Sequence, residues 1–209
     1  MKLEYLGHAC FKITLANGLV WVTDPYDGSV GLARPGVKAD VTTLSHGHYD
    51  HNCLDALDGA GEVLSKAGTY QVGGAKFTLI KRYHDDVQGA KRGENLLTIC
   101  EADGLKVCHA GDLGHQPDAE LIAQLSGLNA LMLPIGGTYT LDGPGAARAV
   151  RAIAPRAVIP MHYRVDKLTL NISGPEPFLN EIGAYTTVGS ELELTADTAG
   201  VIMMKPARG

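Results

Sequence analysis

Side chains that commonly bind metal ions are concentrated in one short segment, which directly follows the apolar run VTTLS: Ser45-His46-Gly47-His48-Tyr49-Asp50-His51-Asn52. Imidazole and carboxylate groups are costly to bury without partners. A metal ion supplies such a partner, and these donor atoms suit zinc best, with manganese and iron also accommodated. The segment therefore predicts a metal centre held at the end of a rigid strand. The alternative, a surface cluster of histidines, fits poorly with a position after a core strand.

Three further candidate ligands each follow an apolar run of strand length. His84 follows KFTLIKRY, Asp112 follows LKVCHAG, and His162 follows AVIPM. A lone histidine after a strand is more often a loop residue than a ligand. One loop cannot saturate two ions, however, and the joint occurrence of these residues at strand ends favours a shared site with the segment from His46 to His51.

The elements that position these residues are mainly strands. The chain opens with alternating apolar residues, turns at Asn17-Gly18 and resumes in LVWVTDP, which predicts a hairpin. Further runs of strand length are VTTLS, KFTLIKRY, NLLTIC, LKVCHAGD, NALMLPIGG, RAVIPMHY, ELELT and VIMMK. Helices are expected in PDAELIAQLSGL, with Pro117 in its first turn, in GPGAARAVRAIAP and in PEPFLNEIG. This order predicts a layered α/β protein.

Composition narrows the class of protein. With 209 residues, 45% of them hydrophobic, the chain suits one globular domain over residues 1–209. The net charge is −5 and the basic residues are scattered, so neither a nucleic acid nor a membrane surface is expected as a partner. The N-terminus lacks the apolar stretch of a signal peptide, and the four cysteines form no CxxC motif. A cytoplasmic protein with reduced thiols is expected.

The ordered motifs resemble a known family. HGHYDH, His84, Gly111-Asp112 and Pro160-Met161-His162 are similar in order and spacing to the ligand motifs of the metallo-β-lactamase superfamily. The segments HDD with RGEN, HAGDLGH, PIGGTYT and IPMHY resemble the small stand-alone hydrolases related to ascorbate-phosphate lactonase. The resemblance runs from His8 to about Arg164. It implies a four-layer αββα sandwich with the metals at one edge.

The resemblance also implies a ligand set for two divalent ions, most simply zinc, with manganese or iron possible. The first ion would be held by His46, His48 and His84, the second by Asp50, His51 and His162, and Asp112 would bridge them. Asp24, in Thr-Asp-Pro, corresponds to an early aspartate of the family that orients ligands without binding metal.

Hydrolysis without a protein nucleophile is the chemistry expected of such a site. Two neighbouring cations lower the pKa of a shared water, which gives a metal-bridging hydroxide at neutral pH. Asp50 is the expected catalytic carboxylate, which orients the nucleophile and passes a proton to the leaving group. The chain has no GxSxG motif and no cysteine in an activating motif, so covalent catalysis lacks a candidate.

Three residues have two open interpretations each. His8 lies in the first strand and is either near the metals or a hydrogen-bonded structural histidine. His109 points from its strand either toward the site or into the core. Arg92 follows His84 in a glycine-containing loop and either binds an anionic substrate through its planar donor fork or is solvated at a loop tip.

The expected substrate is a small, anionic ester, lactone or phosphoester, whose identity the sequence leaves open. An iron-dependent oxidoreductase of the same fold is one alternative, and a metal-dependent phosphodiesterase or nuclease is another. The short acidic chain offers no room for a flavin domain and no basic path for a nucleic acid. A homo-oligomer is compatible with the sequence.

Overall fold

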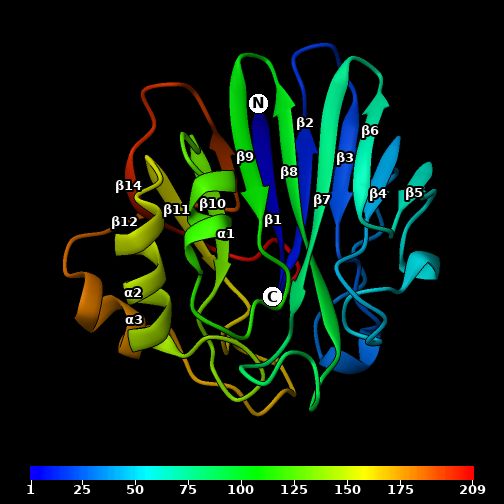
Figure 1. Ribbon diagram of the computed structural model, residues 1–209. Helices are drawn as coiled ribbons and strands as arrows, with labels where there is room; N and C mark the ends of the chain where they lie inside the picture. The colour runs from blue at the N-terminus through cyan, green and yellow to red at the C-terminus, as the bar shows by residue number, and fades with distance from the viewer.

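The computed structural model describes residues 1–209 and consists of two β-sheets packed face to face, with three α-helices outside the larger one (Figure 1). The first sheet has six strands in the order β13-β1-β2-β3-β4-β5. Its strands are β1 (Lys2–Gly7), β2 (Cys10–Thr14), β3 (Val20–Thr23), β4 (Val41–Thr43), β5 (Glu62–Leu64) and β13 (Glu191–Glu193). β13, β1, β2 and β3 pair antiparallel, whereas β3, β4 and β5 pair parallel.

The second sheet has eight strands in the order β12-β14-β11-β10-β9-β8-β7-β6. Its strands are β6 (Gly68–Val72), β7 (Ala75–Tyr83), β8 (Glu94–Ala102), β9 (Leu105–His109), β10 (Ala130–Pro134), β11 (Ala157–Met161), β12 (Thr186–Val188) and β14 (Gly200–Met204). β6 to β9 form an antiparallel meander, and β9, β10, β11, β14 and β12 run parallel. The parallel strands β10 and β11 are buried along their whole length, as sheets covered on both faces require.

The helices α1 (Ala119–Gln124), α2 (Gly143–Ile153) and α3 (Glu176–Ile182) pack on the outer face of the second sheet. Asp142 caps α2 by accepting the Gly145 N–H at 2.8 Å, and Ala154 ends that helix in the left-handed conformation. Outside the first sheet lie loops with two short 3-10 helices, η1 (Gly28–Val30) and η2 (Leu54–Ala56), over a separate apolar cluster. None of the helices has the length and apolarity needed to cross a membrane.

The core between the sheets follows from the alternation of the strands. Tyr5, Phe11 and Trp21 point inward from the first sheet and pack against Phe77 and other apolar residues of the second. Neighbours with the opposite parity, such as Leu6 and Val22, face the outer cluster. The two faces of the first sheet are thus both covered, although its outer layer contains no α-helix.

Several sequence-based expectations need correction. Asn17-Gly18 does connect two antiparallel strands, β2 and β3, but the preceding segment is itself broken into β1 and β2 at His8. His8 therefore lies in a turn and not within the first strand, with a positive φ of 54° after Gly7. Pro117 precedes α1, which begins after the capping residue Asp118. The short strands β5, β6 and β12 were not expected, because their mostly exposed residues show no apolar run.

Candidate metal centre

The chain reverses or turns after six strands at one end of the sandwich, and the expected ligands lie there together. His8 follows β1, Asp24 follows β3, and the segment from His46 to His51 follows β4. In the second sheet, the expected ligands at the ends of β7, β9 and β11 are His84, Asp112 and His162. Both sheets therefore contribute to one site at their shared edge.

The donor atoms fall into two sets with a shared centre. The first set contains His46, His48 and His84. The second set contains Asp50, His51 and His162 and, in addition, His8. A third grouping joins His46 and His51 to Asp112, and within each grouping all donor atoms lie within 4.8 Å of one another. The separation into sets agrees with the division of ligands that the sequence resemblance implies.

Asp112 occupies the middle of the cluster. Its Oδ2 lies 3.1 Å from His84 Nε2, 3.2 Å from His162 Nε2 and 3.9 Å from His46 Nε2. Its Oδ1 lies 3.3 Å from His51 Nε2. One carboxylate thus faces ring nitrogens of both sets, which is the position that a bridging ligand needs.

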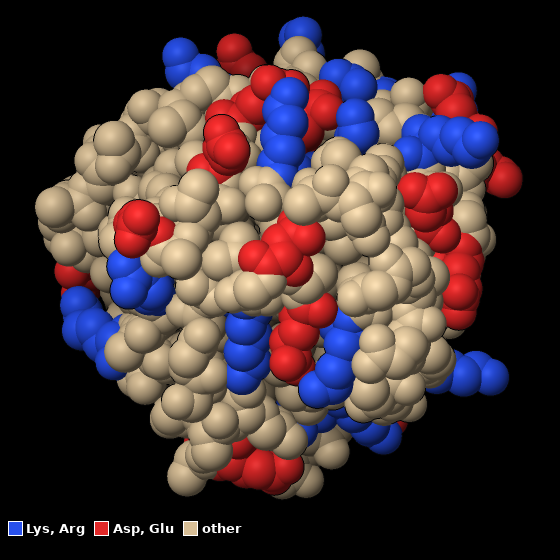
Figure 2. Space-filling model, turned by 90° about the horizontal axis from the view of Figure 1, so that it is seen from above, with Lys and Arg blue, Asp and Glu red and all other residues tan.

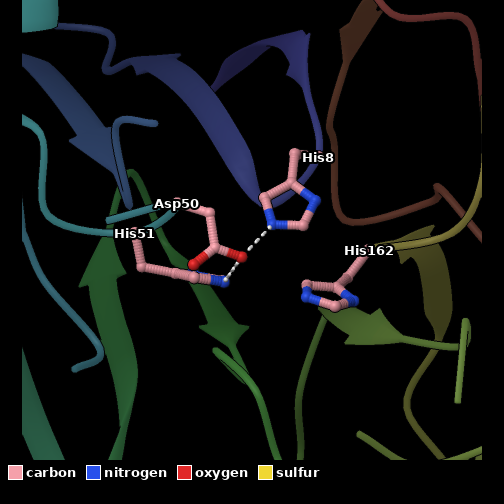
Figure 3. Close-up of side chains that lie close together, drawn as sticks. All are labelled: His8, Asp50, His51 and His162. Atoms are coloured by element: carbon pink, nitrogen blue, oxygen red, sulfur yellow. Dashed lines mark hydrogen bonds and ion pairs between the residues drawn. The ribbon is translucent and has the colours of Figure 1, made fainter. Parts of the chain in front are cut away.

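Figure 3 shows the second set, with its four side chains pointing toward one another from the segments that follow β1, β4 and β11. His8 Nε2 lies 3.1 Å from Asp50 Oδ2, and the same oxygen lies 3.4 Å from His51 Nε2. The backbone of His8 is also fixed, because its carbonyl accepts the Tyr5 hydroxyl at 2.9 Å and the His162 N–H at 2.8 Å. The structure therefore favours the first interpretation of His8, in which it lies beside the expected metal ligands.

A hydrogen-bond network behind the ligands sets the orientation of two imidazoles. The Asp24 carboxylate accepts hydrogen bonds from His51 Nδ1 at 2.9 Å, from the Ser45 backbone N–H at 2.7 Å and from the Ser45 hydroxyl at 2.5 Å. The Ser45 oxygen in turn lies 2.9 Å from His46 Nδ1. With Nδ1 engaged in this way, the Nε2 atoms of His46 and His51 face the centre of the cluster.

Asn95 and Gly111 position Asp112, a role that the sequence did not predict for either residue, although Gly111 belongs to the Gly111-Asp112 motif. Asn95 accepts the Asp112 N–H at 2.8 Å and donates to the Ala110 carbonyl at 2.9 Å. Gly111 has a φ of 52°, and a Cβ there would lie 2.3 Å from Asn95 Oδ1 and 2.5 Å from Ser45 Cβ. A glycine is required at this close approach. The only sequence signal for Asn95 is its place in the RGEN segment of the family resemblance.

The expected metal group fits the residues present. Several buried atoms have no hydrogen-bond partner, including His51 Nε2, Asp112 Oδ1 and His162 Nε2. His46 Nε2 and His48 Nδ1 also lie only 2.9 Å apart. Buried polar atoms are rarely left unpaired, and ring nitrogens that converge with a carboxylate on one point offer a cation its ligands. The donor set, imidazole and carboxylate, suits zinc, manganese or iron.

The electrostatics of the cluster keep Asp112, His46 and His8 in their ligand forms. At His51, by contrast, burial is outweighed by the carboxylates of Asp112, Asp24 and Asp50, which raise the pKa of that imidazole well above its usual range. A metal ion bound by His51 would therefore displace a proton. Burial opposes ionisation of Asp112, but His162 and His51 outweigh burial and hold the pKa of that carboxyl well below its usual range. Burial lowers the pKa of His46 to about 3 and that of His8 to about 4, with the nearby imidazoles His51 and His162 adding to the effect. Ionised carboxylates and neutral imidazoles are the forms that bind metal.

His109 is separated from this cluster by its own hydrogen bonds. Its Nε2 donates to the Ala9 carbonyl at 2.8 Å, and its Nδ1 accepts the Gly111 N–H at 3.3 Å. Both ring nitrogens are therefore occupied, and His109 belongs to none of the metal-binding groupings. This geometry supports the structural interpretation of the residue.

A pocket of about 470 Å³ opens onto the cluster. Its lining residues are Gly47, His48, Tyr49, Asp50, His84, Arg92, Asp112, Tyr139 and Leu170. A larger hollow, of about 600 Å³, lies beside Met1 and contains no comparable cluster of donors. The pocket above the ligands is the one with the means to do chemistry.

Arg92 reaches the pocket because the loop that carries it is held in one conformation. The Asp85 carboxylate accepts four backbone N–H groups of this loop at 2.7 to 2.9 Å, those of Val87, Gly89, Lys91 and Arg92. These bonds lower the pKa of Asp85 to about 2. Arg92 Nη2 then donates to the Thr138 carbonyl at 2.9 Å, and its guanidinium carbon lies 5.5 Å from the centre of the Tyr139 ring.

Comparison with known proteins places the chain among enzymes. Residues 2–162 match the model of the beta-lactamase superfamily domain. A UPF0173 metal-dependent hydrolase from Methanoregula boonei is 32% identical over 200 residues, which cover 83% of this chain and 87% of that protein. Another from Thermoplasma acidophilum is 29% identical and covers 90% and 95%. A Thermotoga maritima structure, proposed to be a Zn-dependent hydrolase of the metallo-β-lactamase superfamily, is 33% identical, with a TM-score of 0.81 and 97% of each chain covered.

Proposed function

Because the chain belongs to the metallo-β-lactamase superfamily and is a metal-dependent hydrolase, we propose that it uses two metal ions to hydrolyse a small anionic ester, lactone or phosphoester. The expected αββα fold class is confirmed by the same likeness. The observation that carries the proposal is the central position of Asp112 between two sets of donors, at the floor of a pocket that Arg92 also lines.

The division of the donors supports two ions. The cluster holds five expected histidine ligands and two carboxylates, more than the four donors that a single zinc site usually takes. His46, His48 and His84 form one sufficient set, and Asp50, His51 and His162 form another. Asp112 is the one carboxylate that contacts ring nitrogens of both.

Two divalent ions bound there would supply an activated water and neutralise the charge that develops on the substrate. Asp50 is the residue for proton transfer, since it lines the pocket and its side chain is 11% exposed. His8 and His51 both contact Asp50 Oδ2 and so restrict the rotation of that carboxylate. No Ser, Thr, Cys or Lys side chain lines the pocket, and its aspartates and histidines are the expected metal ligands, so water is the proposed attacking group.

The position of Arg92 is the evidence for an anionic substrate. Arg92 is half-buried and lines the pocket, and its guanidinium has a single hydrogen bond, to the Thr138 carbonyl, so most of its donor fork is available to a carboxylate or phosphate. A cation fixed opposite the metal ligands orients an anionic substrate by its charge.

A nucleic-acid substrate is not supported by the charge distribution. The net charge is −5. Figure 2 shows the face opposite the pocket, where Lys and Arg are interspersed with Asp and Glu and form no continuous basic area. Around the pocket itself, Arg92 is the one Lys or Arg side chain in the lining. Affinity for a phosphate backbone depends on a continuous basic area. The net charge and the size of the pocket favour a small molecule as the substrate, and a cytoplasmic location remains part of the proposal.

Elemental analysis and a substrate panel test the proposal together. The purified protein is expected to contain about two zinc or manganese ions per chain and to hydrolyse members of a panel of lactones, phosphodiesters, phosphomonoesters and thioesters. Asp50→Asn should retain the metal more fully than the activity. One ion per chain would contradict the dinuclear site, and iron with oxygen consumption would favour the oxidoreductase.

The anionic preference has its own test. Arg92→Ala should raise KM for an anionic substrate about tenfold and leave metal content and a neutral substrate nearly unchanged. Arg151→Ala is the matched control, because Arg151 lies on α2 and contacts Glu181, outside the pocket. Equal losses on charged and neutral substrates would exclude Arg92 as the anion contact.

A further inference from the structure

The walls of the pocket differ in character from its floor. The floor is formed by the metal ligands, whereas the walls are formed by Arg92, Tyr49, Tyr139 and Leu170. The wall tyrosines are also unusually exposed for large apolar side chains, with 54% of Tyr49 and 37% of Tyr139 accessible. Exposed aromatic rings at the mouth of a pocket provide contact area for a ligand.

The polar groups that a sugar would need are absent from the walls. No Asn, Gln, Ser or Thr side chain lines the pocket. Apart from the expected metal ligands, the polar side-chain groups are the Arg92 guanidinium and the hydroxyls of the two tyrosines. A substrate rich in hydroxyl groups would lose hydrogen bonds to water there without regaining them from the protein.

Arg92 and Tyr139 form a fixed pair on one wall. The Arg92 guanidinium lies 5.5 Å from the centre of the Tyr139 ring. It also donates a hydrogen bond to the carbonyl of Thr138, the residue that precedes Tyr139. Asp85 holds the backbone of the loop from the other side. The cation and the aromatic ring are therefore presented side by side before any ligand arrives, which lowers the entropic cost of binding.

We infer that the substrate is a small amphipathic anion, with its charged group against Arg92 and an aromatic or branched apolar group between Tyr49, Tyr139 and Leu170. The inference takes the hydrolytic reaction from the proposed function and adds only how the substrate is recognised. The pocket volume of about 470 Å³ suits a ligand of this size. The walls offer polyhydroxylated anions such as sugar phosphates only the guanidinium and two tyrosine hydroxyls, so such anions should bind more weakly.

Binding of two non-hydrolysable anions to the metal-loaded protein tests the inference. Phenylphosphonate and methylphosphonate carry the same charged group and differ in the apolar one, and isothermal titration calorimetry measures both. Phenylphosphonate is expected to bind about tenfold tighter or better, because its ring is removed from water. Equal affinities, or no binding of either anion, would overturn the inference.

Variants test whether Tyr139 contacts the apolar group of the ligand and Arg92 its charged group. Tyr139→Ala should reduce the phenyl-to-methyl ratio to below about threefold, whereas Tyr139→Phe, which keeps the ring, should preserve it. Arg92→Ala should weaken both phosphonates by a similar factor. Tyr185→Ala is the control, since Tyr185 is 50% exposed and lies outside the pocket. An unchanged ratio in Tyr139→Ala would show that the ring binds elsewhere.

These titrations do not depend on turnover. A protein that binds phenylphosphonate preferentially but hydrolyses no member of the substrate panel would contradict the proposed reaction and leave the recognition intact. A protein that hydrolyses simple esters but does not distinguish the two phosphonates would contradict the recognition alone.

Discussion

Replacing Asp24 by asparagine should weaken metal binding although Asp24 is not itself a ligand. The carboxylate is 1% exposed and accepts three hydrogen bonds, one from His51 Nδ1 and two from Ser45. Asparagine has the same shape and tolerates the positive φ of 38° at this position. It has only one accepting oxygen, however, so it cannot serve both the Ser45 N–H on Oδ1 and His51 on Oδ2.

The magnitude follows from the lost acceptor. A ligand imidazole that loses the partner of its second nitrogen typically binds metal about 10- to 100-fold more weakly, which corresponds to about 1.4 to 2.7 kcal/mol. The buried N–H left without an acceptor would also cost about 1 to 3 kcal/mol of folding stability. The loss of affinity should fall mainly on the set that contains His51, since His46 contacts Asp24 only through the Ser45 hydroxyl.

Competition with a chromophoric chelator measures the two affinities. Ser45→Ala is the informative comparison, because it removes the partner of His46 Nδ1 and keeps the bond between His51 and Asp24. Asp58→Asn serves as a surface control, since Asp58 pairs with Arg34 outside the cluster. If Asp24→Asn folds and retains both affinities within about twofold, the hydrogen bond does not tune the ligand and the reasoning is refuted.

Three further outcomes are expected. His48→Ala and Asp112→Asn should each lower the metal content measured by elemental analysis, and full occupancy in both would show that the ligands are misassigned. Asp85→Asn should raise KM for an anionic substrate with kcat and metal content nearly unchanged, because one amide oxygen cannot hold four N–H groups and the loop that carries Arg92 loosens. At pH 8, iodoacetamide should label the half-buried Cys53 faster than the other three cysteines. Burial raises the pKa of both Cys100 and Cys108 to about 12 and so keeps those thiols protonated. Rapid labelling of all four cysteines in the folded protein, measured by mass spectrometry, would contradict this expectation.

Most strands that were predicted from sequence bury several side chains, and β13, predicted from ELELT, is the exception with Leu192 only partly buried. KFTLIKRY and NLLTIC lie in β7 and β8, which are nine residues long each and pair with one another. The short strands β5, β6 and β12 escaped prediction because their positions at or near sheet edges expose most of their residues, so no apolar pattern marks them. Edge strands are defined by backbone pairing, which the side-chain pattern does not encode.

His8 illustrates a second limit. The alternation of apolar residues continues through Tyr5, Ala9 and Phe11, so the pattern predicts a continuous strand. In the structure the chain turns between Gly7 and Cys10, which places the imidazole among the ligands. The one sequence signal of the turn is Gly7, whose φ of 123° is unfavourable for other residues.

The ligands and the substrate contacts differ in how far the sequence determines them. His46, His48, Asp50 and His51 are close neighbours in the chain, so their shared chemistry is visible from the amino-acid sequence alone. Tyr49 lies in the same segment, yet its role as a wall depends on Tyr139 and Leu170, which arrive from loops about ninety residues or more away along the chain. Tyrosine and leucine are common in any chain, and only their position around one pocket distinguishes them from core residues. Ligand chemistry is therefore legible in a local motif, whereas the recognition that separates one substrate from another emerges only when the β4, β7, β10 and β11 loops meet at the edge of the two sheets.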